Sequence, residues 1–412
     1  MAYLSPQIGP LSASQPGQAR NKSKLPGFLG RLNWPFLFNV ALLVALGLVV
    51  VYSAVSHDAE TYSFSRQAVT VALGIIVMLI VWHFDYRRLE HMMIILLIIN
   101  VVLILSPHLP VIGVESKGAQ SWIKIGMTVQ PGEFAKVTVL LLAASVVAKY
   151  EGRLDDPREY IKALIILAIP FLCIMTQPDL GTGLVYLFID ATALVVGGAR
   201  PKFLLMTIGV GVVAIIALLA LDEVLKYETA SGGTEYRILK NYQRNRILVF
   251  LDPSADTSNS GYNLRQAQIA IGSGGFLGKG FGNGTQTGLN YLPEAPTDFI
   301  FCVLAEEFGF VGAMVLLALY LGLIYQSFRI AQGASSLFGS LIVMCVVGMW
   351  LFQILENIGM DCGLMPITGI PLPFVSYGSS FMLVNFVMLG LIGSVWSHSA
   401  GVGKKNVYEV AC

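Results

Sequence analysis

One acidic residue, Asp298, stands where a hydrophobic segment begins directly after a long polar stretch. Thr297 precedes it and is a good N-cap residue, which predicts that Asp298 lies in the first turn of a helix. The backbone N–H groups and the dipole at that helix end favour a carboxylate, so Asp298 is expected to stay ionised near neutral pH. Such a carboxylate acts either as a helix cap or as a general base, and its position alone favours the cap.

A second set of polar side chains marks the start of another hydrophobic segment. Glu133 and Lys136 are spaced i, i+3 and share one helix face, directly after Gln130. They form either a neutralising ion pair or the polar lining of a cavity. Farther along, the proline-containing segment Gly369 to Gly378, which includes Ser376, is expected to form a rigid wall of a cleft.

The polar stretch before Asp298 is rich in cations. Residues 235–251 predict a helix on the membrane surface, because aromatic and aliphatic residues alternate there with Arg237, Lys240, Arg244 and Arg246. A second short helix, predicted over 264–271, carries Arg265. The glycine-rich segment 272–286, which contains Lys279, lacks the spacing of a nucleotide-binding loop. Its glycines either make simple turns or fold tightly beside an anionic ligand.

The composition of the chain is that of a membrane protein. Of its 412 residues, 55% are hydrophobic and only 12% are charged. The net charge of +1 gives no reason to expect a nucleic-acid partner. The five cysteines follow no disulfide or metal-binding spacing, and the five histidines are scattered, so neither a disulfide framework nor a histidine metal site is predicted.

The elements that must position these side chains are helices. The apolar segments predict an all-α polytopic membrane protein with about ten transmembrane helices: 35–55, 67–84, 91–107, 132–149, 160–176, 183–198, 202–221, 298–325, 335–356 and 379–397. A large extracytoplasmic loop, 222–297, separates the seventh and eighth helices. Residues 1–34 and 398–412 are expected to be cytoplasmic tails on either side of the membrane domain 35–397.

The distribution of Lys and Arg predicts the orientation. With the N-terminus inside, 15 of the 26 basic residues lie in inner segments, and seven of the others lie in the long loop, which is exempt from the positive-inside rule. Both termini are therefore expected in the cytoplasm. The informative loops 108–131, 177–182, 222–297 and 357–378 then all lie outside. An outward cleft with cations and a carboxylate, open to lipid, suits an anionic lipid substrate.

Several motifs in this order resemble the SEDS family, whose members include RodA, FtsW and SpoVE. The resemblance covers residues 35–397 and rests on Lys117–Gln120 with Trp122, Gln130–Glu133 with Lys136, Gln177–Thr182, Tyr242–Arg244 with Arg246, Ile271–Gly275, Leu292–Glu294 with Thr297–Phe299, and Gly369–Gly378. The Gly-Ile-Pro-Leu-Pro form of the last motif and Gly284-Thr285-Gln286 resemble RodA more than FtsW. Three positions depart from the family pattern: Ser121 replaces an Arg, Gly132 a Ser, and Ser379 a Gly.

The resemblance implies a peptidoglycan glycosyltransferase of the bacterial cytoplasmic membrane that polymerises lipid II for cell elongation and shape. Its implied partners are the growing glycan strand and a class B penicillin-binding protein. Asp298 then accepts the proton of the attacking GlcNAc 4-hydroxyl. Candidate substrate-binding residues are Gln130, Glu133, Lys136, Arg237, Lys240, Arg244, Arg246, Arg265, Lys279 and Ser376, with Mg²⁺ or Mn²⁺ as a candidate cofactor. A lipid II flippase, or a non-catalytic scaffold for the penicillin-binding protein, is the alternative.

Overall fold

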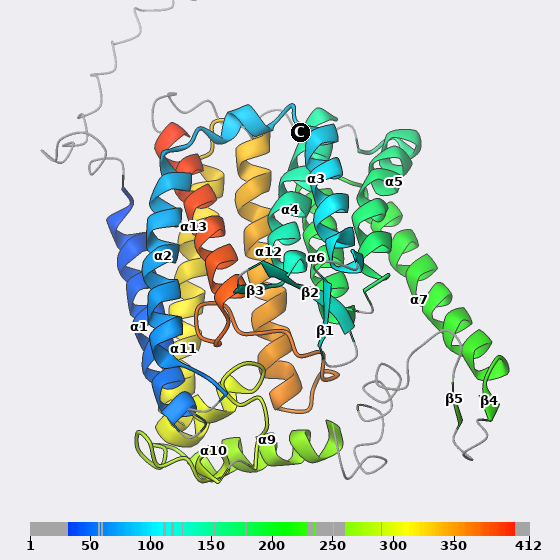
Figure 1. The fold of residues 1–412 in the computed structure, drawn as a ribbon. Helices are drawn as coiled ribbons and strands as arrows, with labels where there is room; N and C mark the ends of the chain where they lie inside the picture. Colours follow the sequence, from blue (N-terminus) through cyan, green and yellow to red (C-terminus); the bar gives the residue numbers. More distant parts are fainter. Residues whose placement is uncertain are drawn as a thin grey trace, which may run out of the picture. The chain divides into compact units, whose positions relative to one another are not determined.

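The computed structural model describes residues 32–56, 58, 61–109, 113–116, 119–125, 127–150, 154–177, 179–228, 234–235, 250, 260–289 and 291–399. Residues from Asn33 onward fold as one unit; of the preceding unit, Met1–Leu32, only Leu32 is described. Ten long helices run through the folded unit (Figure 1): α1 Trp34–Ser56, α2 Phe64–His83, α3 Met93–Leu105, α4 Pro131–Lys149, α5 Pro157–Ile174, α6 Leu180–Val196, α7 Pro201–Val224, α11 Ile300–Gln332, α12 Leu337–Asp361 and α13 Ser379–Ser399.

These helices correspond one to one to the ten predicted spans. Seven of them, all but α3, α5 and α6, are long and apolar enough to cross a membrane. The apolar helices α3 and α6 are shorter, and α5 carries Arg158, Glu159 and Lys162 near its start. The prediction of an all-α polytopic membrane protein is confirmed, with most helix ends within a few residues of the predicted limits.

The core of the bundle lies around α4, α12 and α13, most of whose side chains are buried. Helix α13 packs along α2, α4 lies against α3 and α6, and α12 lies between α6 and α11. Helix α7 differs from the others, since Asp222 is its single buried residue. Its apolar surface is therefore available to lipid.

The eighth span is not one continuous helix as predicted. The backbone of α11 leaves helical geometry at Gly309, where φ is +63° and ψ is −160°. A buried segment, 300–308, therefore precedes the long membrane segment that starts at Phe310. A side chain at position 309 would collide with the Gly278 nitrogen, since its Cβ would lie 2.3 Å away. The glycine-rich loop thus fits directly against the break in α11.

The loop between α3 and α4 contains strands that the helical patterns did not predict. After a short 3-10 helix, η3 Ser106–His108, the strands β1 Gly113–Ser116, β2 Ala119–Ile125 and β3 Met127–Val129 form an antiparallel sheet in sequence order. Val114 pairs with Trp122, and Lys124 pairs with Thr128. The other short elements are η2 Tyr86–Leu89, β4 Tyr227–Glu228, β5 Thr234–Glu235, α9 Ser260–Gly274 and α10 Thr285–Gly288.

Candidate functional site

Asp298 lies in a turn before α11 and not in the first helical turn. Helix α11 begins at Ile300 with Phe299 as its N-cap residue, so the prediction that Thr297 caps this helix is wrong. The Glu294 carbonyl instead accepts the backbone N–H groups of Thr297, Asp298 and Phe299 at 3.1, 3.0 and 3.3 Å. This turn uses the N–H groups that an N-cap side chain would otherwise bind. Asp298 is partly exposed and lies just before α11, whose start is at the end of the bundle opposite the start of α1 and the end of α13 (Figure 1).

Glu294 closes this turn in an unusual conformation. Its φ of +57° lies in the left-handed region, which non-glycine residues seldom adopt. Its carboxylate oxygen Oε2 accepts hydrogen bonds from the Tyr62 hydroxyl at 2.9 Å and the Thr297 hydroxyl at 3.2 Å. The turn therefore holds two carboxyl groups, Glu294 and Asp298.

Two other parts of the chain fix this turn from the side of the core. The buried Asn357 amide, near the end of α12, donates to the Asp298 carbonyl at 2.7 Å and to the Ile370 carbonyl at 2.9 Å. The Tyr377 N–H donates to the Pro296 carbonyl at 2.8 Å. The backbone of Asp298 is thus tied to α12 and to the segment 369–378, while its side chain lies at the partly exposed side.

The segment 369–378 forms a fixed wall beside the turn, and Ser376 stabilises it from inside. Ser376 is fully buried, and its hydroxyl accepts the Leu372 N–H at 2.8 Å. The Gln67 side chain from α2 donates to the Ser376 carbonyl at 3.3 Å and accepts the Gly378 N–H at 3.2 Å. The hydroxyl of Ser376, predicted to bind substrate, therefore shapes the loop.

Glu133 and Lys136 form an ion pair inside the bundle. The Lys136 Nζ lies 2.6 Å from Glu133 Oε1, and both side chains are almost completely buried. The ammonium group also lies 5.6 Å from the centre of the Phe381 ring, within reach of a cation–π contact. Glu133 Oε2 has no hydrogen-bond partner among the described residues. The nearby Gln130 acts through its backbone, since its N–H donates to the Ser380 hydroxyl.

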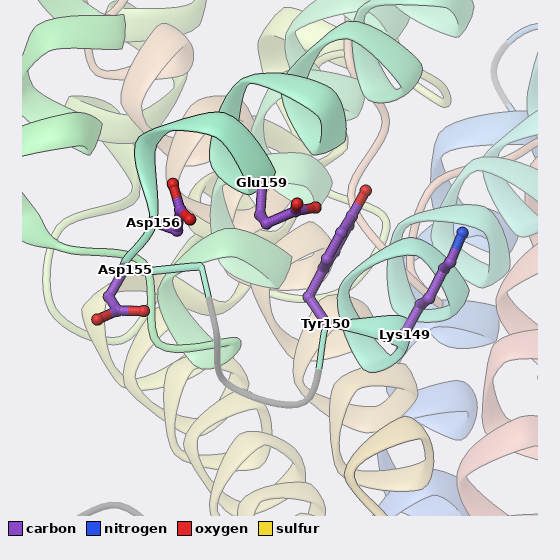
Figure 2. A pocket seen from close by; sticks show the side chains of 5 residues that line it. All are labelled: Lys149, Tyr150, Asp155, Asp156 and Glu159. Atoms are coloured by element: carbon purple, nitrogen blue, oxygen red, sulfur yellow. The ribbon is translucent and has the colours of Figure 1, made fainter.

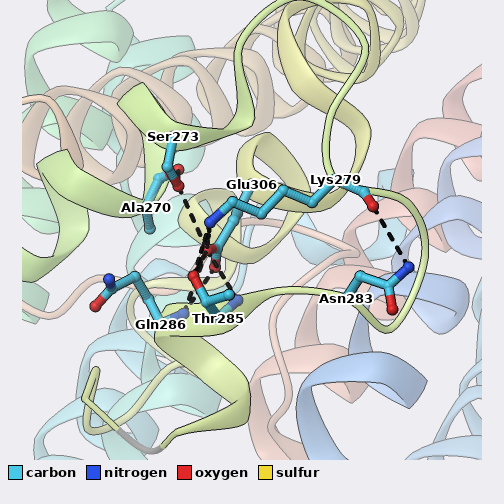
Figure 3. A network of polar contacts seen from close by, with 7 residues as sticks. All are labelled: Ala270, Ser273, Lys279, Asn283, Thr285, Gln286 and Glu306. Atoms are coloured by element: carbon cyan, nitrogen blue, oxygen red, sulfur yellow. Dashed lines mark hydrogen bonds and ion pairs between the residues drawn. The ribbon is translucent and has the colours of Figure 1, made fainter.

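The glycine-rich segment surrounds a carboxylate that is a side chain of the protein itself and not part of a ligand. Figure 3 shows the Glu306 carboxylate of α11 at the centre of a polar network. Its Oε1 accepts Lys279 Nζ at 2.6 Å, together with the N–H and the hydroxyl of Thr285, each at 2.9 Å. The Gln286 N–H donates to both carboxylate oxygens. Lys279, a candidate for binding substrate phosphate, therefore neutralises Glu306.

The remaining predicted cations differ in how far the structure describes them. Arg265 is exposed on α9, opposite the face that buries Leu264, Ala267 and Ala270 against α11. Of the predicted surface helix 235–251, the structure describes only Glu235 and Phe250. Its four cations lie outside the described residues: Arg237, Lys240, Arg244 and Arg246.

Two residues that the sequence analysis did not single out belong to the site, Tyr62 and Asn357. Tyr62 meets Glu294 across 232 positions of the chain, and Asn357 meets Asp298 across 59. Both are single polar residues without a local motif. Asn357 comes directly after the predicted apolar span 335–356, and a polar residue at the end of such a span is a signal that could have drawn attention to this position.

A cavity of about 570 Å³ lies at the opposite end of the bundle, between the ends of α4 and α5 (Figure 2). Its described carboxylates are engaged: Asp155 with Arg200, Asp156 with the N–H of Arg158, and Glu159 with Lys162. Each of these three carboxylates therefore already has a partner within the protein. Among the described residues, no group of three or more His, Cys, Asp and Glu side chains is placed to hold a metal ion.

Comparison with known sequences gives concordant matches over nearly the whole chain. The family model of FtsW, RodA and SpoVE, described as "Cell cycle protein", matches residues 33–401. The chain is 35% identical to the peptidoglycan glycosyltransferase MrdB of Escherichia coli K12, over 89% of this chain and 94% of MrdB. It is 33% identical to the stage V sporulation protein E of Bacillus subtilis, with coverage of 87% and 95%.

Solved structures show the same similarity in three dimensions. One similar chain comes from a structure described as "Structural coordination of polymerization and crosslinking by a peptidoglycan synthase complex". Its TM-score is 0.73 at 29% identity, over 90% of this chain and 99% of the other. The rod shape determining protein RodA of Thermus thermophilus has a TM-score of 0.62 at 27% identity, over 88% of this chain and 96% of RodA.

Proposed function

The chain belongs to the SEDS family of FtsW, RodA and SpoVE and is a peptidoglycan glycosyltransferase, and we propose that it polymerises lipid II with Asp298 as general base. The observation that carries this proposal is the turn 294–299. It holds two partly exposed acidic residues, Glu294 and Asp298, while Asn357 and Tyr377 bind its backbone. A base must be held at a fixed position relative to the proton that it accepts. The hydrogen bonds to the backbone of this turn hold Asp298 at such a position.

In the proposed reaction the acceptor GlcNAc 4-hydroxyl attacks C1 of the donor MurNAc. Asp298 takes the hydroxyl proton as the new C–O bond forms, and the bond from C1 to the pyrophosphate oxygen breaks. The undecaprenyl pyrophosphate leaves with the electron pair of that bond. A general base of this kind contributes about 10²- to 10⁴-fold to the rate.

Positive charge near the pyrophosphate would stabilise the leaving group. Arg265 is the described candidate with an exposed guanidinium, while Lys136 and Lys279 are paired with carboxylates. The cations of 237–246 stay candidates from the sequence. Mg²⁺ or Mn²⁺ stays a candidate cofactor from the sequence, and among the described residues no group of three or more His, Cys, Asp and Glu side chains is placed to hold it.

The protein is a multi-pass protein of the inner membrane, and we place both termini in the cytoplasm. The support for this orientation is that eight of the fourteen described Lys and Arg residues lie in or beside the connections at the end of the bundle that holds the start of α1 and the end of α13: Arg87, Arg88, Lys149, Arg158, Lys162, Arg200, Lys202 and Arg329. Asp298 then faces the outside. A class B penicillin-binding protein is the proposed partner, because one similar structure is a complex of polymerisation and cross-linking.

Polymer formation from purified lipid II by the Asp298→Asn protein tests the proposed role. This isosteric change removes the base, so we expect polymer formation to fall by about 10²-fold or more. Asp58→Asn is the matched control, since Asp58 also lies at this end of the bundle and caps the N–H of Thr61. Wild-type polymer formation by Asp298→Asn would refute the role of base.

Two variants, Asp298→Asn and Lys136→Ala, test the two alternative functions. A flippase would keep moving lipid II across liposome membranes after Asp298→Asn but would lose this activity after Lys136→Ala. A non-catalytic scaffold would form no polymer in any variant, with or without its penicillin-binding protein.

A further inference from the structure

Tyr62 connects two distant parts of the chain at the site. It lies in the short connection between α1 and α2, and its hydroxyl donates to Glu294 Oε2 at 2.9 Å. The Thr297 hydroxyl donates to the same oxygen. Because Thr297 belongs to the turn itself, Tyr62 is the contact that ties the Glu294 carboxylate to the α1–α2 connection.

Tyr62 is itself held in place. Its ring packs edge-on against the Tyr377 ring, with 5.2 Å between centroids, and the Tyr377 N–H binds the Pro296 carbonyl. Burial and the adjacent Glu294 carboxylate raise the pKa of Tyr62, and Asp298 and Asp58 add to this effect. Tyr62 therefore stays a neutral phenol, able to donate a hydrogen bond to Glu294, throughout the physiological range.

The conformation of Glu294 determines where Asp298 stands. The Glu294 carbonyl accepts the N–H groups of Thr297, Asp298 and Phe299, so rotation of Glu294 would open the turn that carries Asp298. Its left-handed backbone is strained for a residue with a side chain. Such a conformation persists where surrounding contacts hold it, and Tyr62 supplies one of them through the carboxylate.

We propose that Tyr62 is a positioning residue of the glycosyltransferase site, which holds the Glu294 carboxylate and thereby the turn that presents Asp298. This inference rests on the proposed role of Asp298 as general base. Tyr62 does not touch the reacting atoms in this proposal. It acts by keeping Glu294, and with it the Asp298 carboxylate, in one geometry.

Lipid II polymerisation by the full-length Tyr62→Phe protein tests this role. The variant keeps the ring on Tyr377 and removes only the hydroxyl. We expect kcat to fall by roughly tenfold, as for loss of one hydrogen bond to a charged group, with little change in KM or melting temperature. Tyr52→Phe is the control, since Tyr52 is half-exposed, also packs on aromatic rings, and makes no hydrogen bond through its hydroxyl among the described residues.

A double-mutant cycle with Glu294→Gln separates positioning from a general structural effect. If Tyr62 acts through Glu294, the double variant should be no slower than the slower single variant. Wild-type kcat in Tyr62→Phe, additive losses in the double variant, or a loss of activity that follows a lower melting temperature would each overturn the proposal. An inactive Asp298→Asn beside a fully active Tyr62→Phe refutes this inference alone, whereas an active Asp298→Asn refutes the proposed function.

Discussion

At the scale of single residues, the site depends on neighbours that lie far away in the sequence. Asp298 is recognisable from the sequence, because an acidic residue stands there between a polar loop and an apolar span. The residues that fix it, Asn357 and Tyr62, come from other elements. Local pattern predicted Thr297 as the cap of α11, but three backbone N–H bonds to Glu294 produced a different turn.

Gly132 is a residue at which a change should stabilise the protein. Its added Cβ would lie in ordinary contact, 3.7 Å from Ile174 Cδ1 and 4.0 Å from Gln177 Oε1. The buried Gln177 Oε1 has no hydrogen-bond partner among the described residues. Gly132→Ser should therefore raise stability by about 1 kcal/mol, through reduced chain entropy and a new hydrogen bond. Thermal unfolding in detergent measures this change.

Two further variants test why Gly132→Ser should stabilise the protein. Gly132→Ala supplies the side chain without the hydroxyl and has the better helix propensity, so a Ser variant less stable than the Ala variant contradicts the new hydrogen bond. Gly393→Ser should destabilise the protein, because its Cβ would lie 2.0 Å from the Trp82 ring.

At the scale of elements, the hydrophobic pattern located the helices but not their internal break. Hydropathy averages over a window, so it joined 300–308 to the membrane segment after Gly309. The break depends on backbone contacts with a distant loop: the Phe310 N–H binds the Gly275 carbonyl, and the Lys279 N–H binds the Glu306 carbonyl. The strands of 113–129 were missed for a related reason, since short pairings carry little periodic signal.

The network around Glu306 predicts that Lys279 supports the loop and does not bind substrate. Lys279→Ala and Glu306→Gln should both lower the melting temperature, because each leaves a polar group of the network without its partner. The expected loss is about 3 kcal/mol for Glu306→Gln. Lys226→Ala is the control, since its ion pair with Glu223 is half-exposed and should contribute little. A Lys279→Ala protein with wild-type stability and a higher KM for lipid II would instead indicate a substrate contact.

At the scale of the whole molecule, the start of α1 and the end of α13 lie at one end of the described bundle, and the start of α11, close to Asp298, lies at the other (Figure 1). The orientation relative to the cell follows from the basic residues and is open to direct measurement.

Cys362 provides a native probe of this orientation. It is exposed and follows α12, at the same end as Asp298. A membrane-impermeant maleimide should label the protein in intact spheroplasts and should fail to label Cys362→Ser. Burial and Asp361 raise the pKa of the Cys362 thiol, so less thiolate is present at neutral pH and labelling should accelerate as the pH rises. Labelling of Cys362 only after permeabilisation would reverse the proposed topology.

The sequence by itself determined the apolar helices, the family and Asp298 as the candidate base, whereas the turn that carries Asp298 was not predicted. A helix that crosses a bilayer needs about 20 apolar residues and forms its backbone hydrogen bonds within itself. Such a segment can therefore be recognised in the sequence alone. The tertiary structure decided which partners these residues meet: Tyr62 with Glu294, Asn357 with Asp298, and Lys279 with Glu306. These contacts depend on how separate segments pack, and no local pattern encodes the distance between two side chains that the chain brings together from remote positions.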